Sequence, residues 1–255
     1  MSAHRSVPRL REKWQYPSIV RAHDLVRRYS AGALAPRQCV VVWNPKVMAT
    51  LRRRFRAKAL PGARALYSLP SRTRSVGLVS PGGIGAPGTI TQCEELVASG
   101  TRDLIGVGFA GALSPDLRPG DVVVCDGAVR DEGTSHHYAP PELRAVPSAS
   151  LSRWLRVALR GADVACRVGP SWTTDAPYRE TAAELRHYRR RGVLTVDMEA
   201  SALFIFGRVR RCRTAAVFVV SDVLSEDGWE PRFRDVRPRL EAVATAVLRA
   251  LTTNP

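Results

Sequence analysis

Seven short runs of apolar, largely β-branched residues recur along the chain, and a turn or a helical pattern follows each of them. A continuous apolar run of roughly four to eight residues is typical of a strand buried on both faces of a parallel or mixed sheet. The runs that predict strands are 38–43, 63–69, 75–80, 103–108, 121–127, 192–197 and 214–220.

Between and after these runs, apolar residues recur at the spacing of a helix that packs one face on a core. The segments that predict helices are 88–99, 151–160, 178–191, 198–206 and 236–252. The sequence contains no internal repeat and no low-complexity linker. Alternating strands and helices predict a single α/β domain over 21–255, with a central mixed sheet flanked by helices, preceded by an N-terminal arm over 1–20.

The charge balance is the unusual feature of the composition. Lys and Arg total 39 against 23 Asp and Glu, which gives a net charge of +16. Such a chain could bind nucleic acid, acidic membranes or anionic substrates. The basic residues are spread along the chain, however, with local clusters only at 52–56 and 189–191. No zinc spacing, helix-turn-helix pattern or aromatic–basic RNA signature accompanies them, so we interpret the charge as an arginine-rich surface and expect no specific nucleic-acid partner.

The five cysteines are widely spaced and lie mostly inside apolar runs. Their odd number and spacing favour buried, reduced thiols over disulfides or a metal site. The N-terminus is polar and lacks the apolar segment of a signal peptide. No apolar run approaches the roughly 18 residues of a membrane helix. We therefore expect a cytoplasmic protein with no membrane partner and no metal.

Two glycine-rich segments follow predicted strands, VSPGGIGAPG at 79–88 and GVGFAGA at 106–112. Glycine lets a ligand approach main-chain N–H groups closely. Ligands of α/β sheets bind at the carboxyl ends of the strands. The two segments predict a ligand crevice, and its candidate residues are Gly83, Gly85, Gly108, Phe109 and Ala110.

A third segment, VLTVDMEASALF at 193–204, places Asp197 and Glu199 on either side of Met198 where a predicted strand gives way to a helix. A carboxylate at such a junction either caps the helix or belongs to a binding site. Other polar groups occur in comparable places. They are the loop 128–141, Trp172 and Arg179 in the polar loop 172–180, and Ser221 and Asp222 at the end of a very apolar strand.

The order of the motifs GIGAP, GVGFAGAL, RDEGTSHHYAP, WTTDAPYRET, VDMEASALF and VVSDVL resembles the nucleoside phosphorylase superfamily. That group includes uridine phosphorylases, purine nucleoside phosphorylases and related nucleosidases. The likeness spans about residues 38–225, and VDMEASALF and RDEGTSHHYAP are its most specific pieces. It implies a partly closed sheet, a homodimer or hexamer, and cleavage of the N-glycosidic bond of a nucleoside.

The resemblance also implies roles for individual residues. Glu199 would accept hydrogen bonds from the ribose hydroxyls and stabilise an oxocarbenium-like sugar, while Met198 packs on the ring. Asp222, in its pair with Ser221, would protonate or hydrogen-bond the leaving base. Arg179 lies near the position from which uridine-acting members reach the pyrimidine carbonyl. We favour a purine, since Asp222 matches better than Arg179. Trp172 and the residues 108–110 would complete the substrate site.

The chain departs from the family where phosphate binds. The first turn, WNPKV at 43–47, lacks the expected Arg, and Gly106 stands where a second Arg would lie. Losing two guanidiniums that bind phosphate bidentately is not conservative. Three explanations are open: other cations such as Lys46, Arg52 or Arg130 bind the phosphate, the acceptor is water and the protein is a nucleosidase, or an anionic group of the substrate is held elsewhere.

We favour phosphorolysis, with inorganic phosphate as co-substrate at the glycine loop and no other cofactor. Hydrolysis is the main alternative, and a nucleoside- or nucleotide-binding protein without turnover is a further one. Related enzymes also place a histidine from a neighbouring subunit's N-terminal arm at the pocket, and His4 lies in such an arm here.

Overall fold

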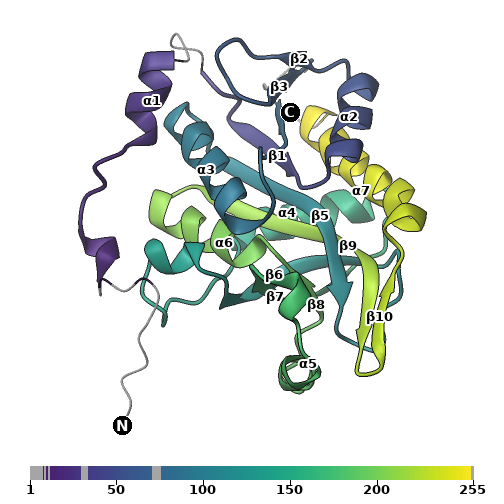
Figure 1. The fold of residues 1–255 in the computed structure, drawn as a ribbon. Coiled ribbons are helices and arrows are strands. Elements are labelled where there is room, and N and C mark those ends of the chain that lie inside the picture. The colour runs from purple at the N-terminus through teal and green to yellow at the C-terminus, as the bar shows by residue number, and fades with distance from the viewer. Residues whose placement is uncertain (1–7, 9, 11, 30–33, 71–75, 254–255) are drawn as a thin grey trace.

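The fold is a ten-stranded mixed sheet flanked by helices, seen in a computed structural model that describes residues 8, 10, 12–29, 34–70 and 76–253 (Figure 1). The strands are β1 Gln38–Val42, β2 Lys58–Ala59, β3 Leu66–Leu69, β4 Val76–Val79, β5 Asp103–Ala112, β6 Val122–Asp131, β7 Arg167–Thr174, β8 Thr195–Asp197, β9 Arg213–Ser225 and β10 Gly228–Pro231. The helices are α1 Ala22–Tyr29, α2 Pro45–Arg54, α3 Gly85–Ala98, α4 Ala149–Arg160, α5 Ala182–Arg189, α6 Ala200–Arg210 and α7 Phe233–Thr253, with short 3-10 helices η1 Lys13–Gln15, η2 Thr134–His137 and η3 Pro177–Arg179.

The sheet is partly closed, as expected. Its strand order is β10-β9-β6-β7-β8-β5-β1-β4-β3-β2, and a further pairing between β9 and β5 joins five of the strands into a ring. Strands β4, β1, β5 and β9 lie next to one another in this order and run parallel to one another. Their carboxyl ends therefore meet at one edge, where ligands of such sheets bind.

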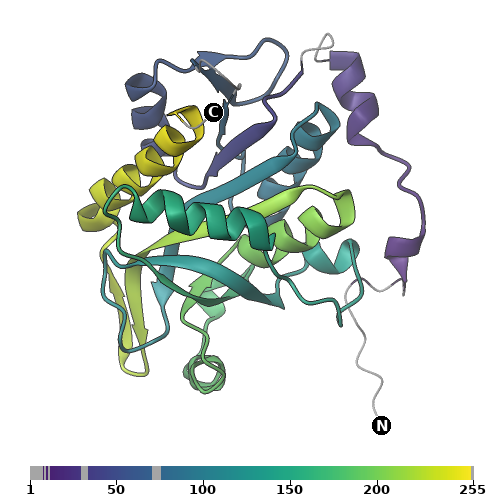
Figure 2. The ribbon, with the colours of Figure 1, turned by 180° about the vertical axis from the view of Figure 1, so that it is seen from behind.

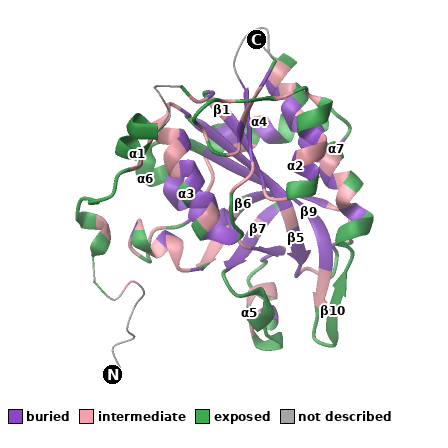
Figure 3. Ribbon diagram, turned by 45° about the horizontal axis from the view of Figure 1, so that its top comes forward, coloured by how far each residue is buried: buried purple, intermediate pink, exposed green. Residues whose placement is uncertain are grey.

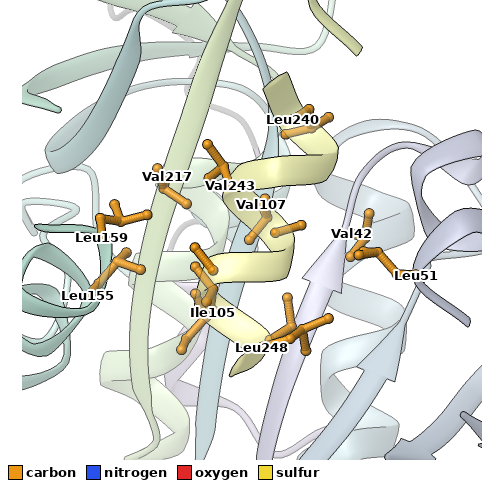
Figure 4. Packing of buried hydrophobic residues seen from close by; sticks show 14 of the residues in the cluster. Val42, Leu51, Ile105, Val107, Leu155, Leu159, Val217, Leu240, Val243 and Leu248 are labelled. Carbon is orange, nitrogen blue, oxygen red and sulfur yellow. The ribbon is translucent and has the colours of Figure 1, made fainter. Parts of the chain in front are cut away.

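Helices cover both faces of the sheet, as the two opposite views show (Figures 1 and 2). On one face α2, α4 and α7 contribute Leu51, Leu155 and Leu248 to one buried cluster (Figure 4). On the other face α3 and α6 contribute Ile90 and Phe204 to a second cluster. The buried residues lie on the strands of the sheet and on the sides of these helices that face it (Figure 3). Removal of this apolar surface from water is the main force that stabilises the fold.

All seven predicted strands and all five predicted helices exist, with shifted ends. The segment 172–180 was expected to be a polar loop, and this was wrong for its first three residues, which end β7. Of these three, Thr173 donates its hydroxyl to the buried carboxylate of Asp197 at 2.9 Å. The helix α2 was not predicted. It starts because the Asn44 side chain accepts from Lys46 N and Val47 N, at 3.1 and 3.0 Å, and Pro45 follows it.

The remaining expectations for the fold have mixed outcomes. All five cysteines are free thiols, and Cys166 alone among them is not fully buried. In the described residues, no helix is both long and apolar enough to cross a membrane. The helix α1 packs near α3, at the side of the domain (Figure 1). The boundary between an arm and a domain at residue 20 stays a prediction, and His4 lies outside the described residues.

Candidate functional site

A cavity of about 690 Å³ opens at the carboxyl edge of β1, β5 and β9. The start of α5 and the β9–β10 hairpin, both at the lower edge of the sheet in Figure 1, line its two sides. The junction between β8 and α6 forms a further wall. Segments distant in sequence thus converge on one hollow, where the glycine loops and the VDMEASALF segment were expected to meet.

Asp197 fixes the start of α6. One of its carboxylate oxygens accepts from Glu199 N and Ala200 N at 2.7 and 2.6 Å, and the other accepts from the hydroxyls of Ser171 and Thr173 at 2.8 and 2.9 Å. A carboxylate at a helix N-terminus is favoured by the free N–H groups and by the helix dipole. Asp197 therefore has the helix-start role suggested by its position, and it fixes the backbone of the residue that follows Met198.

Glu199 follows Met198, and the hydrogen bonds of Asp197 hold its backbone so that its carboxyl group lines the cavity. It is 7% exposed, and its Oε1 accepts from Gly85 N at 3.1 Å. Gly85 has φ +74°, a conformation that favours glycine. Burial, together with the charge of Asp197, raises the pKa of Glu199 to about 8. Since Asp197 has four donors and Glu199 has few, Glu199 is the member of the pair that takes up a proton.

Asp222 reaches the cavity because of an irregularity in the sheet. Ala110 pairs with Val220 and Gly111 pairs with Asp222, so Ser221 is an extra residue in β9. Such β-bulges re-aim side chains and are frequent beside active sites. A Cβ on Gly111 would lie 2.8 Å from Asp222 Oδ2, so only glycine leaves room for this carboxylate.

Two donors hold the Asp222 carboxylate. Ser221 Oγ donates to Oδ1, and Trp229 Nε1 donates to Oδ2 at 2.8 Å. Trp229 lies on β10 and is 56% exposed, while Asp222 is 7% exposed. The ring of Phe233 packs edge-on against both Trp229 and Phe109, with centroid distances of 6.2 and 5.8 Å. This end of the cavity therefore combines a carboxylate with an aromatic wall.

Glu180 lies between η3 and α5 and lines the same end of the cavity. Burial raises its pKa to about 7, and the nearby charges of Asp222 and Glu184 act in the same direction. No hydrogen-bond or ion-pair partner of its carboxyl group is found in the described part of the chain.

The indole of Trp43 covers the glycines of β5. A Cβ on Gly106 would lie 2.1 Å from Trp43 Cη2, and one on Gly108 would lie 2.7 Å from Cε3. Trp43 Nε1 donates to Thr89 Oγ1 at 3.0 Å, and the ring stacks on Phe218 at 5.8 Å. The indole thus fills the space into which any side chain at position 106 would extend.

Six of the residues that the sequence assigned to the substrate site line the cavity: Phe109, Ala110, Met198, Glu199, Ser221 and Asp222. The backbone N–H of Gly85 donates to the carboxyl group of Glu199, and Gly108 packs against the indole of Trp43. Arg179 and Lys46 are exposed and do not line it, although Tyr178 and Asn44 beside them do. Gly83 packs against the backbone of Gly88.

Trp172 and Arg130, two of the candidate site residues, lie away from the cavity. Trp172 is buried in the core, where its Nε1 donates to Asp131 Oδ2 at 2.9 Å and its ring packs on Tyr188. Arg130 donates to the carbonyls of Pro140, Ala139 and Leu143 at 2.6, 3.0 and 2.9 Å and braces the following loop. Neither residue lines the cavity, and the guanidinium of Arg130 is already hydrogen-bonded within the protein.

Sequence reasoning missed Trp43, Glu180 and Trp229 as cavity residues. Asp227 and Gly228, between two short polar stretches, are a hairpin signal that would have placed Trp229 on a turn back towards Asp222. For Trp43 and Glu180 the sequence carries no comparable signal, since their positions depend on tertiary packing.

The cavity is acidic although the chain is basic. The carboxyl groups that line it belong to Glu180, Asp197, Glu199, Asp222, Glu226 and Asp227. Among the described residues, no Lys or Arg lines it. Glu226 is paired with Arg186 at 2.6 Å outside the lining. Among the residues that the structure describes, no three His, Cys, Asp or Glu side chains are grouped so as to hold a metal ion.

Comparison with known proteins agrees with this geometry. Residues 39–253 match the model of the phosphorylase superfamily, and the chain belongs to that family. It is 38% identical over 149 residues to uridine phosphorylase of Treponema pallidum, covering 54% of this chain and 58% of the relative. It is 34% identical over 138 residues to guanosine phosphorylase of Halorubrum lacusprofundi, covering 54% and 57%. These alignments thus span little more than half of the curated relatives.

Solved structures extend the likeness of the fold. A Plasmodium knowlesi homolog of Plasmodium falciparum PNP superposes with a TM-score of 0.73 at 23% identity, covering 86% of this chain and 88% of that one. Uridine phosphorylase from Vibrio fischeri gives 0.71 at 25% identity, covering 86% and 92%. The resemblance inferred from the motifs is confirmed, and relatives named for uridine, guanosine and purine nucleosides all occur.

Proposed function

We propose that the protein cleaves the N-glycosidic bond of a nucleoside. The observation that supports this most is the convergence of Glu199 and Asp222 on one cavity, from the start of α6 and the bulge of β9. Cleavage of this bond develops positive charge on the sugar and negative charge on the leaving base. A carboxylate for the sugar and a carboxyl group for the base are the two groups that such a reaction needs.

At the sugar end, Glu199 accepts hydrogen bonds from the ribose 2′- and 3′-hydroxyls, and Met198 packs against the ring. The raised pKa of Glu199, about 8, falls when an oxocarbenium-like sugar lies beside it, because the opposite charge favours the ionised form. The ionised carboxylate attracts the positively charged sugar more strongly than the neutral substrate, so it stabilises the transition state more than the substrate.

At the base end, Asp222 protonates or hydrogen-bonds the leaving base. We propose a purine nucleoside, modified or not, as the substrate. Asp222 lines the cavity, with Ser221 and Trp229 orienting its carboxylate. Arg179, the residue expected to reach a pyrimidine carbonyl, is exposed and does not line it.

Two molecules are candidates for the acceptor of the sugar, phosphate and water. Phosphorolysis, giving the free base and a pentose 1-phosphate, is supported by relatives whose names are phosphorylases. Hydrolysis is supported by the cavity itself: no cation lines it among the described residues, and the indole of Trp43 fills the space above Gly106. Phosphate carries negative charge and binds poorly to a lining of carboxylates without a cation.

One experiment tests both parts of this proposal. The protein is incubated with a panel of purine and pyrimidine nucleosides, with and without inorganic phosphate, and the sugar product is identified. Ribose 1-phosphate formed only with phosphate supports phosphorolysis, and free ribose at the same rate in both conditions supports hydrolysis. Binding of nucleosides without either product would favour a nucleoside-binding protein instead.

We propose a homodimer or hexamer as the functional unit and a cytoplasmic location. The rim of the cavity supports the first of these, since Ile84 is 79% exposed and Tyr178 is 94% exposed there. These two side chains are therefore available to a neighbouring subunit at the mouth of the cavity. Sedimentation of the intact chain measures the oligomeric state, and a monomer at all concentrations would contradict it.

A further inference from the structure

We propose that Glu180 selects nucleosides whose base carries an amino group, such as adenine or cytosine, over bases that carry a carbonyl oxygen at the same place. This inference rests on the proposed cleavage of nucleosides and adds a specificity residue to that site. It concerns the carboxyl group at the base end that the sequence motifs did not identify.

The position of Glu180 supports this role. It lines the cavity together with Asp222, Trp229 and Phe233, which form the base end. Glu180 and Asp222 line one cavity, and the negative charge of Asp222 adds to burial in raising the pKa of Glu180. The carboxyl of Glu180 has no protein partner in the described residues, so it is free to bind a ligand.

The hydrogen-bonding capacity of this end decides the base edge that fits. An ionised carboxylate only accepts hydrogen bonds, so it pairs with an amino group and repels a carbonyl oxygen. The two donors nearest to Asp222, the Ser221 hydroxyl and the Trp229 indole N–H, already donate to Asp222. No Lys or Arg of the described chain lines the cavity to serve a carbonyl oxygen.

The titration of the Glu180 carboxyl group also makes this preference depend on pH. The pKa of Glu180 is raised to about 7 by burial, so the carboxyl is largely ionised at pH 8 and largely protonated at pH 6. A protonated carboxyl can donate to a carbonyl oxygen. The preference for amino-bearing bases therefore grows as the pH rises through 7.

The test uses two pairs, adenosine with inosine and cytidine with uridine, in which a carbonyl oxygen replaces the amino group and the neighbouring ring nitrogen gains a proton. N1-methylinosine and N3-methyluridine, which lack that N–H, are measured beside them, so that a hydrogen bond from the ring N–H to the carboxylate is separated from the effect of the exocyclic group. Dissociation constants are measured by calorimetry at pH 6 and pH 8, for the wild type and for Glu180→Gln, and kcat/KM is measured for every nucleoside that is cleaved. We expect wild type at pH 8 to favour the amino member by about tenfold or more, because the wrong edge leaves a half-buried carboxylate unpaired.

Glu180→Gln offers both a donor and an acceptor, so it is expected to reduce or reverse the preference by about tenfold and to remove its pH dependence. Glu142→Gln is the control, since Glu142 is exposed and lies outside the cavity, and it removes one charge as well. An unchanged preference in Glu180→Gln, or a wild type that favours the carbonyl member at pH 8, overturns the proposal. Selective binding without cleavage supports it and refutes the proposed function alone.

Discussion

The two ends of the cavity hold their carboxyl groups in different ways. At the sugar end, Glu199 is fixed by a buried frame in which Asp197 accepts four hydrogen bonds from β7 and the start of α6. At the base end, Asp222 is held by Trp229, a side chain of an exposed hairpin. Under the proposed function, the sugar, which nucleosides share, contacts the buried carboxylates, while the variable base contacts a surface hairpin that can change without disturbing the fold.

The largest expected effect is at the rigid end. Glu199→Gln keeps the shape of the side chain and its acceptor for Gly85 N, but it cannot become negative. We expect kcat to fall by about 10²–10³-fold, the range seen when one electrostatic stabiliser of a transition state is removed. Turnover is measured with the best nucleoside of the panel. Activity equal to wild type would remove Glu199 from the reaction.

Asp222→Asn tests the exposed end, and we expect a loss of about 10²-fold in kcat for purine nucleosides. The amide keeps a partner for the Trp229 N–H but cannot donate a proton to the base. Arg179→Ala is the matched comparison, because Arg179 is exposed beside the cavity. If Asp222→Asn left purine cleavage intact and Arg179→Ala abolished pyrimidine cleavage, the assignment of the base end would be wrong.

The pH dependence of folding stability tests the burial of Glu199 separately from its role in catalysis. The pKa of Glu199 is about 8 in the folded protein, above its usual value, so the folded state binds the proton more tightly. Stability from this group is fully present below its unfolded pKa and is lost as the pH rises through 8. We expect Glu199→Gln to be more stable than wild type by about 4–5 kcal/mol at pH 9, and nearly equal at pH 4, in thermal unfolding. Equal pH profiles would show that Glu199 is not buried in this way.

The smallest effect is expected from Trp229→Phe. The aromatic wall stays, but the N–H that donates to Asp222 is lost, while the Ser221 hydroxyl still donates. A net contribution of about 1 kcal/mol for one hydrogen bond corresponds to a fall of about fivefold in kcat/KM. The melting temperature should not change, because the hairpin is exposed. A loss as large as that of Asp222→Asn would mean that the hairpin belongs to the rigid part of the site.

The sequence predicted the rigid end better than the exposed one. VDMEASALF placed Glu199 and Asp197 correctly at a strand–helix junction, because local spacing alone decides that geometry. The apolar runs likewise predicted the strands, since burial on both faces leaves a continuous signal. Trp172, by contrast, was expected in the site because it belongs to a polar segment. The hydroxyls of Ser171 and Thr173 beside it satisfy Asp197 in the core, and only the folded structure shows this.

The residues missed at the base end depend on contacts between distant segments. Glu180 meets Asp222 across 42 positions of sequence, and nothing in either local pattern indicates the encounter. The guanidinium of Arg130, one of the phosphate candidates, does not line the cavity and donates to three backbone carbonyls. Charge alone does not tell a ligand contact from a structural brace.

The indole of Trp43 above Gly106 also constrains how this site can evolve. An Arg introduced at position 106 would collide with the ring, since even a Cβ there lies 2.1 Å from Trp43 Cη2. Removing Trp43 first would leave a void against Phe218, and such a cavity costs stability. Positions 43 and 106 are therefore epistatic: either change alone is harmful, and the site can gain a cation at its floor only if both change together.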